Sequence, residues 1–132
     1  MSTSSEAERL KVVDSDFSAA SAAHNLVQAY SGVLDMDARL HRNGLFPITE
    51  STAIAVQVRR ESEKGVMTWM PMYADVAASA DLGYSYGNYT IVKSGTPEPV
   101  EKGSYAHIWR RNAKGEWKLA VDIVTSWPPS KN

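Results

Sequence analysis

The sequence predicts an α+β domain in which helices gather on one side of an antiparallel sheet. Apolar residues at helical spacing, interrupted by one short strand, occupy the first half of the chain up to about residue 61. Four alternating runs rich in β-branched and aromatic residues follow, separated by turn residues. A length of 132 residues suits a single domain, residues 1–132, whose ordered core we expect to span about residues 15–129.

Two helices are expected first. Residues up to about Asp14 are small and polar, so we expect them to fray, with the first helix starting near residue 15. Phe17 and His24 follow one helical face, Asn25 ends this helix, and residues 26–33 form the second. His24 lies on the apolar stripe, where it is either a core residue or a ligand contact.

A short strand and a third helix follow. Residues 35–44 indicate a turn and an alternating strand that places Leu40 and Arg42 on one face. Arg42 at the strand end meets either solvent or an anionic group of a ligand. Residues 50–61 form the third helix, and the charge run at residues 59–65 reads as its solvated end.

The next two strands should be bent. Residues 66–78 form a long strand with Pro71 at a bulge or on a sheet edge. Residues 82–92 form the next, with a bulge at Gly87-Asn88 that bends it. This bulge would bring four side chains to one face: Tyr84, Tyr86, Tyr89 and Ile91.

Residues 102–124 predict a hairpin, since two β-rich runs flank the loop from Asn112 to Gly115. If Arg111 faces Glu116, alternation divides the side chains between two faces. One face carries Tyr105, His107, Trp109, Ala120, Asp122 and Val124. The other carries Ala106, Ile108, Trp117, Leu119, Val121 and Ile123. The second face is apolar, which predicts a homodimer through Ile108, Trp117, Leu119 and Val121.

The first face carries the candidate chemistry. His107 and Asp122 are diagonal neighbours in this register, roughly 7–8 Å apart at Cα. Asp122 would orient His107 and raise its basicity, or itself take a proton next to a carbonyl. The alternative is structural: Asp122 caps a buried hydrogen-bond network and His107 is a core residue bonded to it.

Other side chains are candidate ligand contacts. Tyr30, Tyr84 or Tyr86 would donate to a developing oxyanion, and Arg42 would hold an anionic end. Trp69 and Trp109 would bracket a flat ligand, and the many aromatic residues suit a small hydrophobic or aromatic molecule.

The composition argues against several classes of partner and of chemistry. The formal charge is −1 and no long basic run occurs, which argues against nucleic acid and anionic membranes as partners. No cysteine is present, so neither disulfides nor thiolate chemistry is available. Three histidines without paired ligand spacing argue against a metal site, and we expect no cofactor. No secretory signal or membrane span is visible, which predicts a cytoplasmic protein.

Two stretches of the sequence resemble a known family of domains. Residues 80–89, ADLGYSYGNY, and residues 105–123, YAHIWRRNAKGEWKLAVDI, resemble signature strands of SnoaL-like, ketosteroid-isomerase-like domains. These belong to the nuclear-transport-factor-2-like superfamily, and the likeness is to domains of the domain-of-unknown-function 4440 type. It extends from about Phe17 to Pro129.

The resemblance implies a cone: a strongly curved, mixed but mainly antiparallel sheet wrapped over three N-terminal helices, with a ligand pocket inside and a dimer through the outer face. Steroid isomerases of this superfamily have an aspartate base where Arg42 aligns, and a second acid near His107, so steroid isomerisation is not expected. Polyketide cyclases use a carboxylate and histidines, which His107 and Asp122 resemble. The functional prediction is an isomerase- or cyclase-type enzyme acting on an enolisable carbonyl compound; the alternative is a non-catalytic ligand-binding or dimerisation module.

Overall fold

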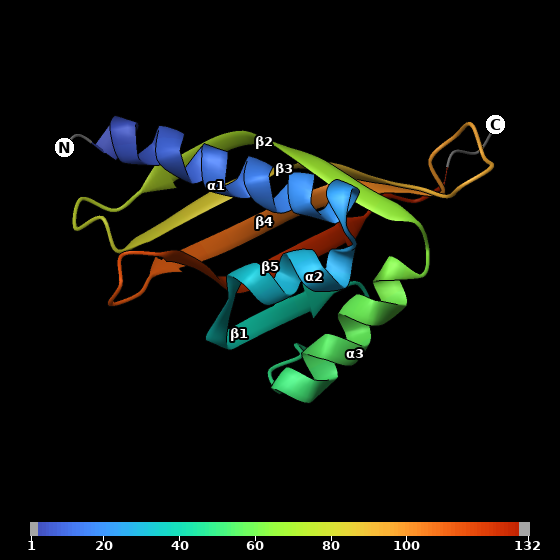
Figure 1. The fold of residues 1–132 in the computed structure, drawn as a ribbon, viewed down its shortest axis with the longest axis horizontal. Coiled ribbons are helices and arrows are strands. Elements are labelled where there is room, and N and C mark those ends of the chain that lie inside the picture. The colour runs from blue at the N-terminus through green and yellow to red at the C-terminus, as the bar shows by residue number, and fades with distance from the viewer. Residues whose placement is uncertain (1–2, 130–132) are drawn as a thin grey trace.

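The computed structural model describes residues 3–129. Within this range three helices pack on one side of a five-stranded mixed sheet, so the predicted α+β class is confirmed (Figure 1). The elements are α1 (Thr3–Ala23), α2 (Leu26–Val33), β1 (Leu34–Arg42), α3 (Ser51–Ser62), β2 (Val66–Val76), β3 (Leu82–Val92), β4 (Glu101–Arg111) and β5 (Trp117–Ser126).

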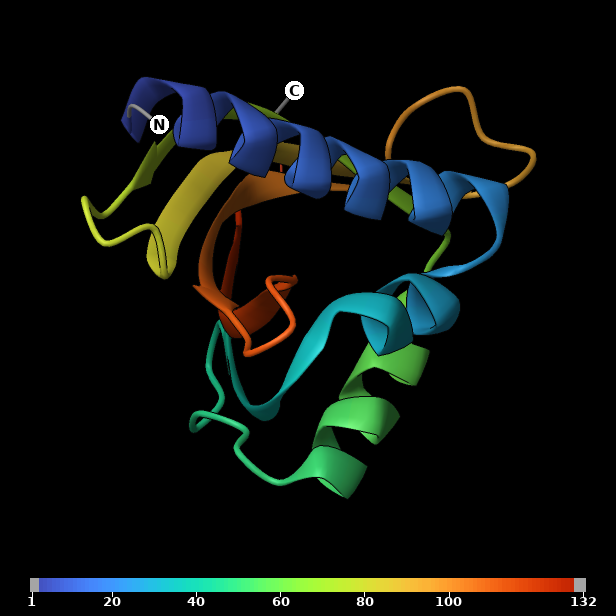
Figure 2. The same ribbon diagram turned by 60° about the vertical axis from the view of Figure 1, so that its left-hand side comes forward.

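The strand order is β1-β5-β4-β3-β2, with β1 parallel to β5 and the other pairs antiparallel. Figure 2 shows the sheet curling, with α1 along one part of its inner face and α2 and α3 along another. None of the described helices has both the length and the apolar character needed to cross a bilayer.

Helix α1 begins at Thr3, so the expected start near residue 15 is wrong. Its buried face mixes apolar residues such as Leu10 and Phe17 with polar residues that are hydrogen-bonded, and this mixture conceals the amphipathic pattern. Ser18 Oγ accepts from the backbone N–H of Trp69 at 2.8 Å, and Ser21 Oγ donates to the carbonyl of Met67 at 2.6 Å. Because β2 is an edge strand, these serines satisfy backbone groups that no neighbouring strand reaches.

Helices α2 and α3 agree with expectation. Asn25 caps α2, its side chain accepting from the N–H of Gln28 at 2.7 Å. Glu50 caps α3 through the N–H groups of Thr52 and Ala53, at 3.1 and 3.3 Å. Each cap satisfies donors that a helix start leaves without an intrahelical partner.

The β4–β5 hairpin forms, but in another register. Arg111 pairs with Trp117 rather than facing Glu116, and a bulge between Ile108 and Trp109 leaves Ala120 as an extra residue on β5. Trp117 and Leu119 therefore face the core, at 8% and 0% exposure. Their predicted place on the outer face is wrong.

The predicted bulge at Gly87-Asn88 is also wrong, because β3 pairs with β4 without interruption from Leu82 to Ile91. The irregularity lies on β2, between Pro71 and Tyr73, as Pro71 on an edge strand suggested. Strict alternation along β3 consequently separates the four side chains that the bulge was to unite. Tyr84 and Tyr86 are exposed on the outer face, and Tyr89 and Ile91 are buried.

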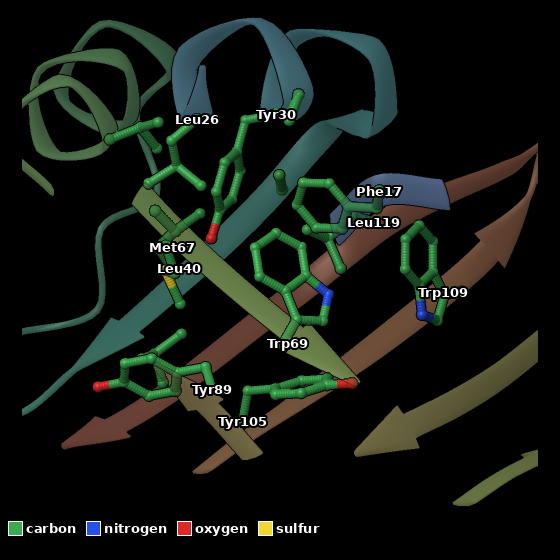
Figure 3. Close-up of a cluster of buried hydrophobic side chains, with 14 of the residues drawn as sticks. Phe17, Leu26, Tyr30, Leu40, Met67, Trp69, Tyr89, Tyr105, Trp109 and Leu119 are labelled. Carbon is green, nitrogen blue, oxygen red and sulfur yellow. The ribbon is translucent and has the colours of Figure 1, made fainter. Parts of the chain in front are cut away.

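Aromatic rings fill the interior beneath α1 (Figure 3). Phe17 makes edge-on contacts with Trp69 and Tyr30, with ring centroids 4.7 and 5.0 Å apart. Trp109 is fully buried, and its indole Nε1 donates to Ser85 Oγ at 2.9 Å. This part of the interior is therefore a packed core.

Candidate functional site

His107 and Asp122 are direct cross-strand partners on β4 and β5, because the bulge at Ala120 moves Asp122 opposite the histidine. Nε2 of His107 lies 3.1 Å from Oδ1 of Asp122, an ion-pair contact without the alignment of a hydrogen bond. Both side chains face the interior, at 3% and 0% exposure. The expectation that they share an enclosed face agrees with this geometry.

A second carboxylate holds the other side of the imidazole. Asp14 on α1 places Oδ1 2.9 Å from His107 Nδ1. The indole Nε1 of Trp69 donates to the same oxygen at 3.0 Å, and the hydroxyl of Tyr105 donates to Oδ2 at 2.8 Å. Sequence reasoning missed Asp14, although its helical spacing from Leu10 and Phe17 places it on the buried stripe.

These contacts set the ionisation of the pair. Burial would lower the pKa of His107, but its interactions with Asp122 and Asp14 outweigh that effect and raise the pKa to about 9. Burial would raise the pKa of Asp122, but the charge of Arg42 and the contact with His107 hold it well below its usual range. At neutral pH His107 is therefore an imidazolium between two carboxylates, without a lone pair to accept a proton.

Arg42 joins this pair to a third helix. Its Nε and Nη2 lie 2.6 and 3.1 Å from the two carboxylate oxygens of Glu61, and Nη2 is also 3.0 Å from Oδ2 of Asp122. The hydroxyl of Tyr30 donates to the same Asp122 oxygen and accepts from Nη2 at 3.2 Å. The side chain of Arg42 is 7% exposed. It therefore does not extend into solvent, and its guanidinium is bonded to groups of the protein rather than left free for an anionic ligand. Alternation along β1 turns it inward with Leu40, beside β5.

Glu61 is the other end of this array. It is 8% exposed in the last turn of α3, and Gln57 Nε2 donates to its Oε2 at 2.9 Å. The interpretation of its charge run as wholly solvated is wrong at this residue, which follows Ile54 and Val58 on the buried face. We call the connected groups the interior charge network: Asp14, His107, Asp122, Arg42 and Glu61.

The network reaches a cavity of about 240 Å³, here called the mouth cavity. Arg42 and Glu61 line it, whereas His107 and Asp122 do not. Across the cavity, Glu101 accepts from the Tyr89 hydroxyl at 2.6 Å and lies 3.2 Å from Lys64 Nζ. The full lining is Arg42, Asn43, Leu45, Gln57, Glu61, Lys64, Met67, Tyr89, Ile91, Glu101, Val124 and Ser126. Gly103 leaves room for Tyr89, because a Cβ there would lie 2.2 Å from the Thr125 carbonyl oxygen and 2.5 Å from the ring of Tyr89.

The residues predicted to contact a ligand lie in different parts of the fold. Tyr30 and Trp69 bond to the carboxylates of the network, and Trp109 belongs to the core. Tyr84 and Tyr86 lie on the opposite face of the sheet from His107, because Ser85 is the residue of β3 that pairs with His107 and side chains alternate along the strand. They cannot donate to a group bound beside His107.

His24 is exposed just beyond the end of α1, where it lines a groove with residues of α1 and α2. It does not line the mouth cavity. No group of three or more His, Asp or Glu side chains among residues 3–129 is arranged to hold a metal ion.

Solved structures share this architecture. A nuclear-transport-factor-2-like protein of unknown function from Pseudomonas putida KT2440 superposes with a TM-score of 0.76 and 12% identity, covering 99% of this chain and 92% of that one. A ketosteroid isomerase-like protein from Erwinia carotovora atroseptica SCRI1043 superposes with a TM-score of 0.69 and 16% identity, covering 90% of this chain and 97% of that one. The chain has the nuclear-transport-factor-2-like fold.

A nuclear-transport-factor-2-like protein of unknown function from Shewanella oneidensis MR-1 agrees, with a TM-score of 0.70, 10% identity, and 89% and 97% coverage. No protein-family model and no curated protein sequence matches this chain. The resemblance to the domain-of-unknown-function 4440 type is therefore not confirmed. Identities this low establish the fold alone, and proteins of one fold carry unrelated functions.

Proposed function

We propose that this protein binds a small molecule in the mouth cavity. The observation that carries the proposal is the cavity's lining: ionisable groups of α3 and β4 stand over apolar side chains of β2, β3 and β5. Ligand sites characteristically combine an apolar wall with a few polar groups that fix orientation. Glu61 and Arg42 are held by bonds on several sides, so the polar part is preorganised.

A fragment screen followed by amide chemical-shift mapping tests this proposal. Leu45 is half exposed on the cavity rim, so Leu45→Trp should obstruct the cavity without disturbing the core. The control is Phe46→Trp, at a neighbouring residue that is 92% exposed and does not line the cavity. We expect Leu45→Trp to weaken binding at least tenfold and Phe46→Trp to leave it unchanged. A screen without binders, or binders indifferent to Leu45→Trp, would refute the proposal.

An acid–base enzyme acting on an enolisable carbonyl compound is the second candidate. Glu61 favours it, because this carboxylate lines the cavity and bonds through Arg42 to Asp122. In this scheme Glu61 takes the proton next to the carbonyl, Asp122 is a positioning residue that holds Arg42, and His107 holds Asp122 in place.

Deuterium incorporation from D₂O into a panel of enolisable ketones and aldehydes tests this candidate. We expect Glu61→Gln to abolish exchange, and Asp122→Asn to lower kcat more than it raises KM. Unchanged turnover of an identified substrate by Asp122→Asn would remove that residue from the mechanism. Detection of binding without exchange for all cavity ligands would favour the non-catalytic alternative.

We also propose a homodimer through the outer face of the sheet, with corrected contacts. Ile108 and Val121 remain in the patch, while Tyr73, Tyr84 and Tyr86 replace the buried Trp117 and Leu119. An apolar, aromatic surface of this kind is uncommon on a monomer. Light scattering should give twice the 14.5 kDa of one chain, and Ile108→Arg should halve that mass. A monomeric mass for the unmodified protein at micromolar concentration would contradict the proposal.

A further inference from the structure

The guanidinium of Arg42 has no donor left for a ligand. Its Nε–H is directed at Glu61, and its Nη2 group at Glu61, Asp122 and the Tyr30 hydroxyl. Its Nη1 lies 3.2 and 3.3 Å from the backbone carbonyls of His41 and Asp122. A guanidinium has five N–H donors, and these acceptors engage all of them. An anionic ligand in the mouth cavity could therefore bond to Arg42 only by breaking bonds within the protein.

The carboxylates of the cavity keep spare acceptor capacity. Glu61 accepts two bonds from Arg42 and one from Gln57, and Glu101 accepts one each from Tyr89 and Lys64. An ionised carboxylate offers about four lone-pair sites, so each can accept a further donor from a ligand. The lining thus favours a ligand that donates hydrogen bonds.

The net charge of the side chains around the cavity is negative, which also favours such a ligand. Three carboxylates, those of Glu61, Glu101 and Asp122, lie at or directly behind the cavity, against the two cations Arg42 and Lys64. His107 does not alter this excess, because Asp14 neutralises it. Lys64 is half exposed at the rim and paired with Glu101, so it is hydrated and already compensated.

We propose that the ligand of the mouth cavity is a small organic cation, an aliphatic amine whose ammonium group lies between Glu61 and Glu101. Its alkyl part contacts the apolar floor of Met67, Ile91 and Val124. A volume of about 240 Å³ suits a short branched chain rather than a polycyclic compound. This inference rests on the proposed function, and it replaces the expected hydrophobic or aromatic ligand with a charged one.

A matched series with one carbon skeleton tests the charge preference: 3-methylbutylamine, 3-methylbutanol and 3-methylbutanoate. Each is titrated into the unmodified protein at low salt and followed by calorimetry and amide shifts. We expect the amine to bind about tenfold or more tighter than the alcohol, since a charge-assisted hydrogen bond is roughly twice as strong as a neutral one. The carboxylate should bind most weakly.

Tighter or equal binding of the alcohol or the carboxylate would overturn the cation assignment while leaving small-molecule binding intact. Binding by none of the three would also overturn it, and the fragment screen then decides separately whether the cavity binds anything. Amine binding that moves no amide near Gln57 and Glu61 counts against it as well.

Variants locate the preference on particular carboxylates. Glu61→Gln should bring the amine close to the affinity of the alcohol. Because that change also removes a partner of buried Arg42, Glu101→Gln provides a second test at a more exposed position, with an expected loss of about fivefold. The control is Glu63→Gln, which removes the same charge from an exposed residue outside the cavity. Equal losses in Glu101→Gln and Glu63→Gln would indicate long-range attraction only and would refute the assigned contact.

Discussion

The sharpest prediction concerns the dependence of stability on pH, because one buried residue should dominate it near neutrality. The pKa of His107 is about 9 in the folded protein and about 6.5 in an unfolded chain. A raised folded pKa means that the stabilisation is complete below about pH 6.5 and is lost as pH rises toward 9. A difference of this size corresponds to about 3 kcal/mol of unfolding free energy.

Urea unfolding followed by tryptophan fluorescence, repeated between pH 6 and 9.5, measures this loss. Trp69 and Trp109 lie 6.0 and 5.8 Å from the His107 ring, so fluorescence reports on this part of the core. The range must end below pH 10. Burial also raises the pKa of Tyr30 and Tyr105, and tyrosine ionisation in the unfolded chain removes stability above that value.

The comparison variants are His107→Gln and His41→Gln. His41→Gln removes an exposed imidazole and should keep the full decline with pH. His107→Gln should be less stable at pH 6, because Asp14 and Asp122 lose the cation between them, but its stability should hardly change up to pH 9.5. The same slope in His107→Gln and the unmodified protein, or no slope in either, would refute a buried imidazolium.

Three further predictions use the same unfolding measurement. Leu119→Ala should lower the free energy of unfolding by about 2–5 kcal/mol, because Leu119 is fully buried. Lys118→Ala should change it by less than about 0.5 kcal/mol, and equal effects of the two changes would contradict the bulged register. Arg42→Met leaves the carboxylates of the network without their guanidinium and should lower the free energy of unfolding by about 3–5 kcal/mol. A decrease no larger than that caused by Arg39→Met, at an exposed residue, would show that these ion pairs are dispensable. The pKa of Asp122 is held low in the folded state, so stability should fall as pH drops below about 4, and Asp122→Asn should flatten that decline; an undiminished slope would mean that other carboxyl groups cause it.

The secondary structure could be predicted where local chemistry is decisive. The second and third helices, the short strand and the four later strands follow from periodicity and turn residues. The start of helix α1 could not be predicted, because Glu6, Asp14 and Ser18 lie on its buried face and a polar residue that bonds to a distant partner has the same sequence signal as a solvated one. Its length depends on contacts with β2 and β4 that no local pattern contains.

Only part of the candidate site could be predicted from the sequence. The pairing of His107 with Asp122 could be inferred from alternation along a hairpin, although a bulge changed the register. Asp14, Glu61 and the inward direction of Arg42 could not be inferred, because each depends on which distant element packs against it. A carboxylate in a charge run looks exposed until an arginine from another element is placed beside it.

The sequence alone determined the class of the domain, the order of its elements and the hairpin that carries an imidazole and a carboxylate. Local propensity and side-chain alternation act over a few residues, and the chain records them directly. Only the tertiary structure decided which groups are charged, which are buried and where a ligand can enter. Those properties arise from electrostatic and packing contacts between residues far apart in the sequence, such as Asp14 and His107, which are 93 positions apart.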